Sequence, residues 1–397
     1  MRASRDHYRQ VVHCTPFHSR TSAANVLNLW HRWRDHTVAD AYFDVTLEYT
    51  ALRNACAVFD ISPMTKHRIS GPDALAFLNR LVTRDVAKIR PGRVGYCVWC
   101  DDRGQVIDDG TIFHLEESVF RLCSQERQLD WLSRSALGFD VAIREETEDV
   151  AALALQGPTS CAVLKRLGLA GVETLAPFAM RGFPFAGGEL LVSRTGFTGD
   201  LGYELWIAPE HAEALWDRLF EAGELLGIRP MGTHALEMSR IEAGFIQAGT
   251  DFLPADRAVR TDRTRSPFEL DLDWLVDFSK PNFTGRRALL EEQRVGSRFR
   301  LVRLDVEGNK PAKDAYVYDD RRNVIGAVTS SMWSPMAKAS IALASVAMPW
   351  GRRGDELWAE IYYQKELRWN RLNARCRVVK GAFYEPARRR MTPPPDR

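Results

Sequence analysis

The residues of this chain best suited to chemistry include a glutamate that follows a glycine-rich turn in the segment Val192–Trp206. The turn holds Gly196, Gly199 and Gly202, and a tight hairpin turn requires one or two glycines. Glycine suits positive φ angles and places where another body approaches the backbone closely. Glu204 then lies in the returning strand, where a carboxylate is costly unless hydrogen bonds satisfy it. Two interpretations stay open: a long hairpin whose glutamate faces water, or a pocket wall whose glutamate accepts hydrogen bonds from a polar heterocycle.

A second pair of candidate residues is Asp108-Asp109, within the predicted strand 106–115. Strand alternation puts the two side chains on opposite faces, so one of them must face inward if the sheet packs on one side. Two adjacent acids inside a strand are also unfavourable by β-propensity. A β-bulge or an exposed edge is the plain alternative. The functional alternative is a carboxylate that lines a cavity.

The composition excludes some classes of function for the chain as a whole. Its 397 residues suggest two or three domains. The net charge of +2, from 54 basic and 52 acidic residues, argues against nucleic-acid or membrane binding as the main task. We find no signal peptide and no run of the ~18 apolar residues that a membrane span needs. The basic run Arg388–Arg390 is expected to be a solvated tail.

The seven cysteines do not predict a metal or redox centre. Cys97 and Cys100 have CxxC spacing, but no second pair or histidine pair stands at zinc spacing. Their segment is a predicted strand, which would point the two side chains in different directions. We therefore expect no bound metal. An odd number of cysteines fits a reducing compartment, so we expect a cytoplasmic protein.

Periodicity predicts a mixed α+β chain that becomes mostly β after residue 298. Residues up to about 20 look irregular, and the proline-rich tail from Thr392 should be extended and mobile. Asp73 is placed to cap the first turn of a helix. Helices are expected within 44–59, from 73, and at 162–167, 211–226, 233–244 and from 283, with a polar loop at 250–266. Strands are expected at 57–61, 67–70, 96–99, 106–115, 152–155, 190–192, 203–206, 301–306, 315–318, 324–329, 339–347 and 357–363.

Several motifs occur in the order found in the glycine-cleavage T-protein family of folate-dependent one-carbon transferases, which the chain resembles over roughly residues 45 to 385. None of them is decisive alone, but the ordered set is specific. The matching segments are Phe59-Asp-Ile-Ser-Pro-Met64, Val106-Ile-Asp-Asp109, Leu155-Gln-Gly-Pro158, Ser193–Gly199, Gly202-Tyr-Glu204, Arg240-Ile-Glu242, Phe268-Glu269, Trp274, Phe283-Thr-Gly285 and Ser330–Pro335.

The resemblance implies a three-domain α+β cloverleaf around a central channel that holds tetrahydrofolate. The corresponding domains would be 1–62 with 150–250 (folate-binding, discontinuous), 63–149 (carrying the two adjacent aspartates), a connecting segment 251–295, and a β-rich domain 296–390. Position identifies Asp109 with the family's catalytic aspartate and Glu204 with its pterin-binding glutamate. Tyr96, Phe197 and Trp274 match positions that bind the cofactor, and Phe197 stands where family members usually have tyrosine.

Departures from the family pattern concern the donor pocket, to which the resemblance assigns His234, Leu236 and Arg240. Leu236 stands where glycine-cleavage members carry an arginine, His234 replaces a glycine, and Pro63 replaces a histidine. Exchanging a cation for leucine removes recognition of a charged or lipoyl-linked donor. The expected reaction is therefore transfer of a methyl or methylene group from a small N-, O- or S-methyl or methylenedioxy compound onto tetrahydrofolate. His234 would act as an acid or cation, or only as a structural residue.

Three other functions stay open from the sequence. One is a glycine-cleavage aminomethyltransferase that uses a lipoyl carrier protein. Another is a folate-binding protein without transfer activity, as in the iron–sulfur assembly branch, although the Lys-Gly-Cys-Tyr motif of that branch is missing near 250–268. The third is a stand-alone copy of a domain usually fused to an amine oxidase. Because no GxGxxG flavin motif occurs, the oxidase would then be a separate partner.

Overall fold

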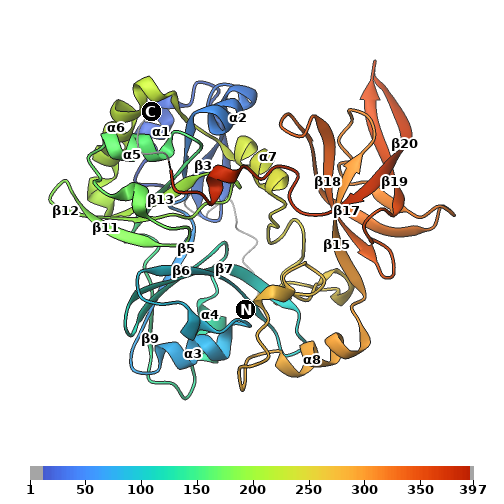
Figure 1. The fold of residues 1–397 in the computed structure, drawn as a ribbon, viewed down its shortest axis with the longest axis horizontal. Helices are drawn as coiled ribbons and strands as arrows, with labels where there is room; N and C mark the ends of the chain where they lie inside the picture. The colour runs from blue at the N-terminus through green and yellow to red at the C-terminus, as the bar shows by residue number, and fades with distance from the viewer. Residues whose placement is uncertain (1–11, 394–397) are drawn as a thin grey trace.

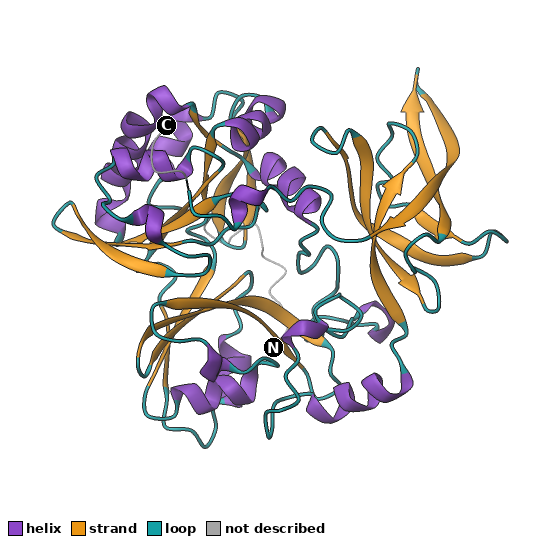
Figure 2. Cartoon of the chain, viewed as in Figure 1, coloured by secondary structure: helices purple, strands orange, loops and turns teal. Residues whose placement is uncertain are grey.

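Three lobes surround a common centre in the computed structural model, which describes residues 12–393 (Figure 1). Helices and strands mix in the first two lobes, whereas strands dominate the third, as Figure 2 shows. The expected α+β class with a β-rich C-terminal part is therefore confirmed.

The first lobe is built on a six-stranded sheet with the order β11-β12-β13-β10-β4-β14. Its apolar core lies between this sheet and helices α5 and α6. On the other face, α2 packs against α7, the helix at the centre of Figure 1. The strands are β4 (Cys56–Asp60), β10 (Ala151–Gln156), β11 (Met180–Phe185), β12 (Gly188–Ser193), β13 (Gly202–Ile207) and β14 (Ile228–Pro230), and the helices are α2 (Val45–Asn54), α5 (Ser160–Arg166), α6 (Ala212–Gly223) and α7 (Thr233–Ala243).

A small three-stranded sheet near the N-terminus has the order β1-β3-β2 and was not predicted. It comprises β1 (His13–Cys14), β2 (Leu29–Trp33) and β3 (His36–Ala41), and helix α1 (His18–Ala24) precedes β2. Part of this sheet lies in the segment up to residue 20 that we expected to be irregular. Such short elements carry too few residues for a periodic signal.

The second lobe contains a five-stranded sheet with the order β6-β7-β8-β5-β9, and helices α3 and α4 pack on one face. Asp73 precedes α3, but its side chain makes no capping bond and instead accepts from the Asp140 N–H at 2.9 Å, so the predicted cap is wrong. The elements are β5 (Thr65–Ser70), β6 (Arg93–Cys100), β7 (Val106–Glu116), β8 (Val119–Ser124), β9 (Ala142–Glu145), α3 (Ala74–Leu81) and α4 (Leu129–Ser135).

The third lobe is a closed barrel with the order β15-β18-β17-β16-β19-β20. Helix α8 (Arg286–Val295) leads into it. The sequence predicted five of the six strands but neither β20 nor closure, which depends on pairing between the first and last strands of the domain. The strands are β15 (Phe299–Val306), β16 (Tyr316–Tyr318), β17 (Val324–Ser334), β18 (Ala339–Ala347), β19 (Glu356–Lys365) and β20 (Arg368–Val379).

The segment after β20 returns from the barrel to the first lobe (Figure 1). Arg388, expected in a solvated tail, donates to both carboxylate oxygens of Asp200 at 2.6 and 2.8 Å and to the carbonyl of Arg53 at 3.1 Å. Because Asp200 is buried and is also paired with Arg53, the solvated-tail interpretation is wrong for Arg388. The segment instead joins two lobes.

The three larger sheets are built from different parts of the chain. The domain limits at residues 62, 150, 250 and 295 remain our proposal, since the sheet topology alone does not set them.

Within residues 12–393 no helix combines the length and the apolar character needed to cross a membrane. The expected mobility of the tail concerns mainly residues 394–397, which lie outside the described part of the chain.

Candidate active site

A hydrogen bond joins the first two predicted site residues, Tyr96 and Asp109. They stand on neighbouring strands β6 and β7, where Tyr96 is the partner of Thr111 and Val98 is the partner of Asp109. This diagonal relationship lets the Tyr96 hydroxyl donate to Asp109 Oδ2 at 2.7 Å. Burial raises the pKa of Asp109 to about 6, against the effect of the Tyr96 bond, and the charge of Asp251 adds to the increase.

The two adjacent aspartates occupy opposite faces of the second-lobe sheet. Asp108 is wholly buried on the face covered by helices, whereas Asp109 is half-buried on the opposite face. A register shift between Trp99 and Cys100 also marks an irregularity in the β6–β7 pair beside them. The fold therefore contains both an irregularity in the strand pair next to Asp108 and an inward-facing carboxylate, that of Asp108 itself.

Glu204 is half-buried on β13 and is held by a short chain of hydroxyl groups. Thr195 donates to Glu204 Oε2 at 2.5 Å, and its hydroxyl lies 2.7 Å from that of Ser193. The Trp206 indole N–H donates to Ser193 at 3.1 Å. Burial raises the pKa of Glu204 to about 7, although the hydroxyls of Thr195 and Ser193 lower it in part. The water-facing hairpin interpretation does not describe this environment.

Gln156 explains two of the three glycines in the turn. A Cβ added at Gly196 would lie 2.0 Å from Gln156 Oε1, and one added at Gly202 would lie 2.3 Å from the same side chain. Gly199 has a positive φ of 71°. Gln156 donates to two carbonyls of the turn, those of Thr195 and Tyr203, at 3.2 and 3.3 Å. The body that approaches these two glycines is thus a buried side chain of the protein.

The strand carrying Asp109 and the strand carrying Glu204 face each other. Phe113 on β7 and Trp206 on β13 make an edge-to-face contact with ring centroids 5.0 Å apart. Alternation puts Asp109 on the Phe113 face of its sheet and Glu204 on the Trp206 face of its own. The charge of Glu204 also acts on Cys123, the β8 partner of Thr111. Both carboxylates therefore face the same space between the two sheets.

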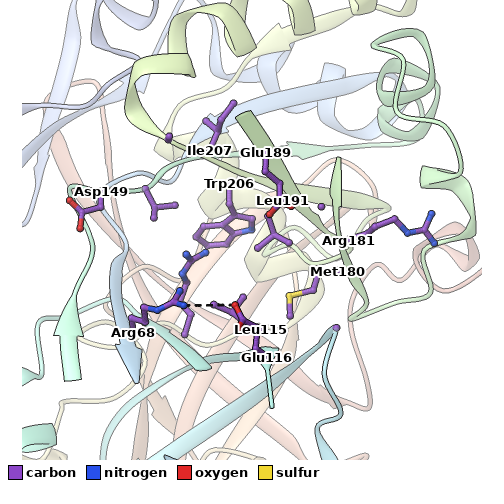
Figure 3. Close-up of a pocket in the computed structure, with 15 residues that line it drawn as sticks. Arg68, Leu115, Glu116, Asp149, Met180, Arg181, Glu189, Leu191, Trp206 and Ile207 are labelled. Carbon is purple, nitrogen blue, oxygen red and sulfur yellow. Dashed lines mark ion pairs between the residues drawn. The ribbon is translucent and has the colours of Figure 1, made fainter. Parts of the chain in front are cut away.

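A groove of about 500 Å³ lies beyond the Phe113–Trp206 contact, where the C-terminal ends of β7 and β13 meet. Figure 3 shows the Trp206 ring at its centre, with the Arg68–Glu116 ion pair beside it. The two candidate acids precede the contact in their strands, and neither lines this groove. Sequence reasoning did not predict it. Its lining residues are Arg68, Gly92, Leu115, Glu116, Arg121, Asp149, Val150, Met180, Arg181, Gly182, Glu189, Leu191, Trp206, Ile207 and Ala208.

The other two predicted cofactor-binding residues, Phe197 and Trp274, are exposed aromatic rings. Phe197 is 36% exposed and stacks on Phe245 with ring centroids 5.7 Å apart. The Arg389 guanidinium lies 5.0 Å from the Phe245 ring centre. Trp274 is 63% exposed, and its ring centroid lies 6.1 Å from that of Tyr96. Flat apolar surface of this kind suits stacking of a planar ring. Phe245 carried no sequence signal of its role.

Arg240, predicted to contact substrate, is wholly buried among protein partners. Its five N–H groups go to Glu237 twice, to the Phe245 carbonyl, to Asp251 at 2.6 Å and to Ser330 at 2.8 Å. No donor is left for a substrate, so the i,i+3 ion-pair alternative accounts for this residue. Asp251, in the predicted polar loop, was missed because nothing in that loop distinguishes it.

His234 and Leu236 do not share a face of α7. His234 is exposed, and its Nε2 lies 4.0 Å from Asp40 near the N-terminal sheet. Leu236 is half-buried and packs against an apolar cluster that includes Phe113 and Trp206. An apolar pocket wall is compatible with the position of Leu236. His234 therefore lies apart from the apolar cluster that Leu236 contacts.

The two cysteines with CxxC spacing lie in the interior of the fold. Cys97 and Cys100 are both buried in different clusters, and burial raises the pKa of each thiol. Residues 12–393 hold no group of three or more histidine, cysteine or acidic side chains that could bind a metal ion.

Comparison with known families matches nearly the whole chain. Residues 23–280 match the GCVT N-terminal domain, and residues 300–385 match the glycine cleavage T-protein C-terminal barrel domain. An aminomethyltransferase from Halothermothrix orenii is 33% identical over 321 residues, which cover 80% of this chain and 86% of that protein. A trimethylamine-oxide aldolase from Ruegeria pomeroyi is 37% identical over 358 residues, which cover 86% of this chain but 43% of that protein.

Comparison with solved structures gives the same result. The structure of the glycine cleavage system aminomethyltransferase T from Bartonella henselae superposes with a TM-score of 0.81 at 26% identity. The match covers 94% of this chain and 98% of that one.

Proposed function

This chain belongs to the glycine cleavage T-protein family, whose aminomethyltransferases use tetrahydrofolate as one-carbon acceptor, and we propose that it transfers a methyl or methylene group from a small donor to that acceptor. The observation that carries the proposal is the pair of half-buried acids, Asp109 and Glu204, on facing strands. The enzyme would be a demethylase-like one-carbon transferase.

The free acceptor capacity of the two acids fits tetrahydrofolate. Among the described residues, neither carboxylate forms an ion pair; Asp109 accepts a hydrogen bond from Tyr96, and Glu204 accepts one from Thr195. Carboxylates of this kind suit a heterocycle that presents adjacent N–H donors. The exposed faces of Phe197 and Trp274 supply apolar area for its flat rings.

Each acid takes a separate role in the proposal. Tetrahydrofolate, when bound, supplies the amine nitrogens that receive the one-carbon unit. Glu204 accepts hydrogen bonds from the pterin edge. Asp109 stabilises positive charge that develops at the reacting amine and can take a proton there, and Tyr96 orients it. A planar ring stacked on Phe197 and Trp274 would cover their exposed faces and keep water from them.

The donor part of the proposal depends on the apolar character of α7 near the site. Leu236 presents no charge to a donor, and the buried Arg240 has no free N–H group. A small uncharged or methylated compound suits this surface better than a charged donor. The name of the Ruegeria relative identifies a methylated amine oxide as its substrate, which supports the same class.

Two alternatives compete with this donor assignment. A lipoyl carrier protein would be the partner if the chain acted as the Halothermothrix relative's name indicates. A separate oxidase would be the partner if the donor had to be oxidised first. The half-buried Asp109 favours an enzyme over a folate-binding protein without activity, because burying an acid without an ion pair is costly and acids with raised pKa values cluster at functional sites.

A direct assay separates these possibilities. Purified protein is incubated with tetrahydrofolate and, in parallel, with methylated amines, methylated sulfur compounds, methylenedioxy compounds or an aminomethyl-lipoyl carrier protein. We expect 5-methyl- or 5,10-methylene-tetrahydrofolate with a small donor. Turnover with the carrier protein alone would contradict the donor assignment, and turnover with none of them would favour the separate-oxidase or the binding alternative.

A further inference from the structure

The buried carboxyl group of Asp108 has no role in the proposed function, although it is directly linked to Asp109. Its Oδ1 accepts a hydrogen bond from the Asp109 backbone N–H at 2.9 Å. Its side chain is wholly buried on the face of the sheet that α3 and α4 cover. Its Oδ2 has no hydrogen-bond partner among the described residues.

The surroundings of Asp108 disfavour a negative charge. On its own face of the sheet lie the buried Cys97 and Ile112, which belong to the apolar core. The charge of Asp108 acts on Arg257, but Arg257 forms its ion pair with Glu126, at 2.9 Å. A buried carboxylate without a cation and with an unsatisfied oxygen is costly, whereas a protonated carboxyl group is much less so.

The charged neighbours of Asp108 also favour its protonated form. Burial and then the charge of Asp109 raise the pKa of Asp108 well above its usual range, and the charge of Glu126 adds to this. The backbone N–H groups of Asp109 and Glu126 oppose the increase. Two carboxyl groups on adjacent residues do not readily ionise together, so the less buried one, Asp109, takes the charge.

We propose that Asp108 is a positioning residue for Asp109: it keeps its proton, holds the Asp109 backbone N–H, and leaves Asp109 as the single negative charge at this point of the strand. A second charge would discourage ionisation of Asp109, which must be a carboxylate to stabilise an amine cation. The role of Asp109 rests on the proposed function, whereas the protonation state of Asp108 does not.

Two variants and one spectroscopic measurement test the proposal on the full chain. Asp108→Asn preserves the shape and the acceptor oxygen, so kcat should stay within about threefold and the acid limb of its pH profile should not move. Asp108→Ala removes the acceptor, so kcat should fall by roughly tenfold or more with KM for tetrahydrofolate nearly unchanged. An Asp108→Asn variant as inactive as Asp109→Asn, or with an acid limb moved by one pH unit, would overturn the proposal, as would an Asp108→Ala variant with unchanged kcat.

Carboxyl carbon NMR tests the protonation state without any substrate. Protein labelled at aspartate Cγ is titrated from about pH 5 to 9, and the signal lost in Asp108→Asn identifies Asp108. We expect the shift of a protonated carboxyl group throughout. Ionisation of Asp108 within that range would overturn the proposal even if the enzyme is active. An absence of transfer activity with a protonated Asp108 would instead count against the proposed function.

Discussion

Tyr96 donates its hydroxyl group to Asp109 across the β6–β7 pair, at 2.7 Å. The bond stabilises the charged form of Asp109, whereas burial favours the neutral form. The balance leaves Asp109 with a pKa of about 6, so that it is mainly a carboxylate at neutral pH.

Removing this hydrogen bond should raise the pKa of Asp109. In Tyr96→Phe we expect the acid limb of the kcat profile to move upward by about one to two pH units, because a bond to a charged group is worth about 1.5–3 kcal/mol. The variant should lose activity at pH 6 and approach wild type at high pH. Tyr318→Phe, which removes a hydroxyl bonded to Glu360 in the barrel, is the matched control. An unmoved acid limb would exclude this role for Tyr96.

Binding of tetrahydrofolate should depend on the ionisation of Glu204. Its pKa of about 7 means that the accepting carboxylate form is lost as the pH falls. Affinity should therefore rise about tenfold between pH 6 and 8, measured by quenching of tryptophan fluorescence. Glu204→Gln should bind more weakly at pH 8 and show a flatter profile. Because the ligand's own titration is common to both proteins, equal slopes would contradict the role of Glu204.

A cation placed at position 236 of α7 should weaken binding of the small donor. Leu236→Arg is expected to raise KM for a small apolar donor by roughly tenfold or more, since a charge is placed where an apolar contact was made. Affinity for tetrahydrofolate should change little. Leu236→Met, which keeps apolar volume, is the control. If Leu236→Arg leaves the donor KM unchanged, Leu236 does not border the donor.

The glycine-rich turn should depend on Gln156 for stability. Gln156→Met keeps the length of the side chain but leaves two buried carbonyls, those of Thr195 and Tyr203, without their partner. We expect a loss of about 2–4 kcal/mol in the free energy of unfolding, measured in urea. Gln364→Met, on the exposed side of β19, should change it by less than about 0.5 kcal/mol. A loss of unfolding free energy no larger than that of the control would show that the stability of the turn does not depend on Gln156.

The sequence predicted the elements that carry strong local patterns. Alternation located β7 and the opposite faces of Asp108 and Asp109, and helical periodicity located α7 up to Gly244. The order of the motifs along the chain indicated the family. The contribution of Gln156 could not be derived, because it depends on strands that are distant in sequence.

Local sequence patterns could not predict the contacts between lobes for the same reason. Arg388 looked like part of a basic tail, yet it pairs with Asp200, which is 188 positions away. The sequence predicted that Arg240 contacts substrate, but in the fold Arg240 donates to Asp251 and Ser330. A single sequence shows which residues are polar, but only the assembled lobes show which polar groups already have partners.

Asp109→Asn tests the central claim most directly, through kcat for one-carbon transfer and the dissociation constant for tetrahydrofolate, both measured on the same preparation. The substitution keeps the shape and removes the charge. We predict that kcat falls roughly 100- to 10,000-fold while the dissociation constant changes less than about threefold. An equal loss of binding and turnover, or no loss of turnover, would contradict a chemical role for Asp109.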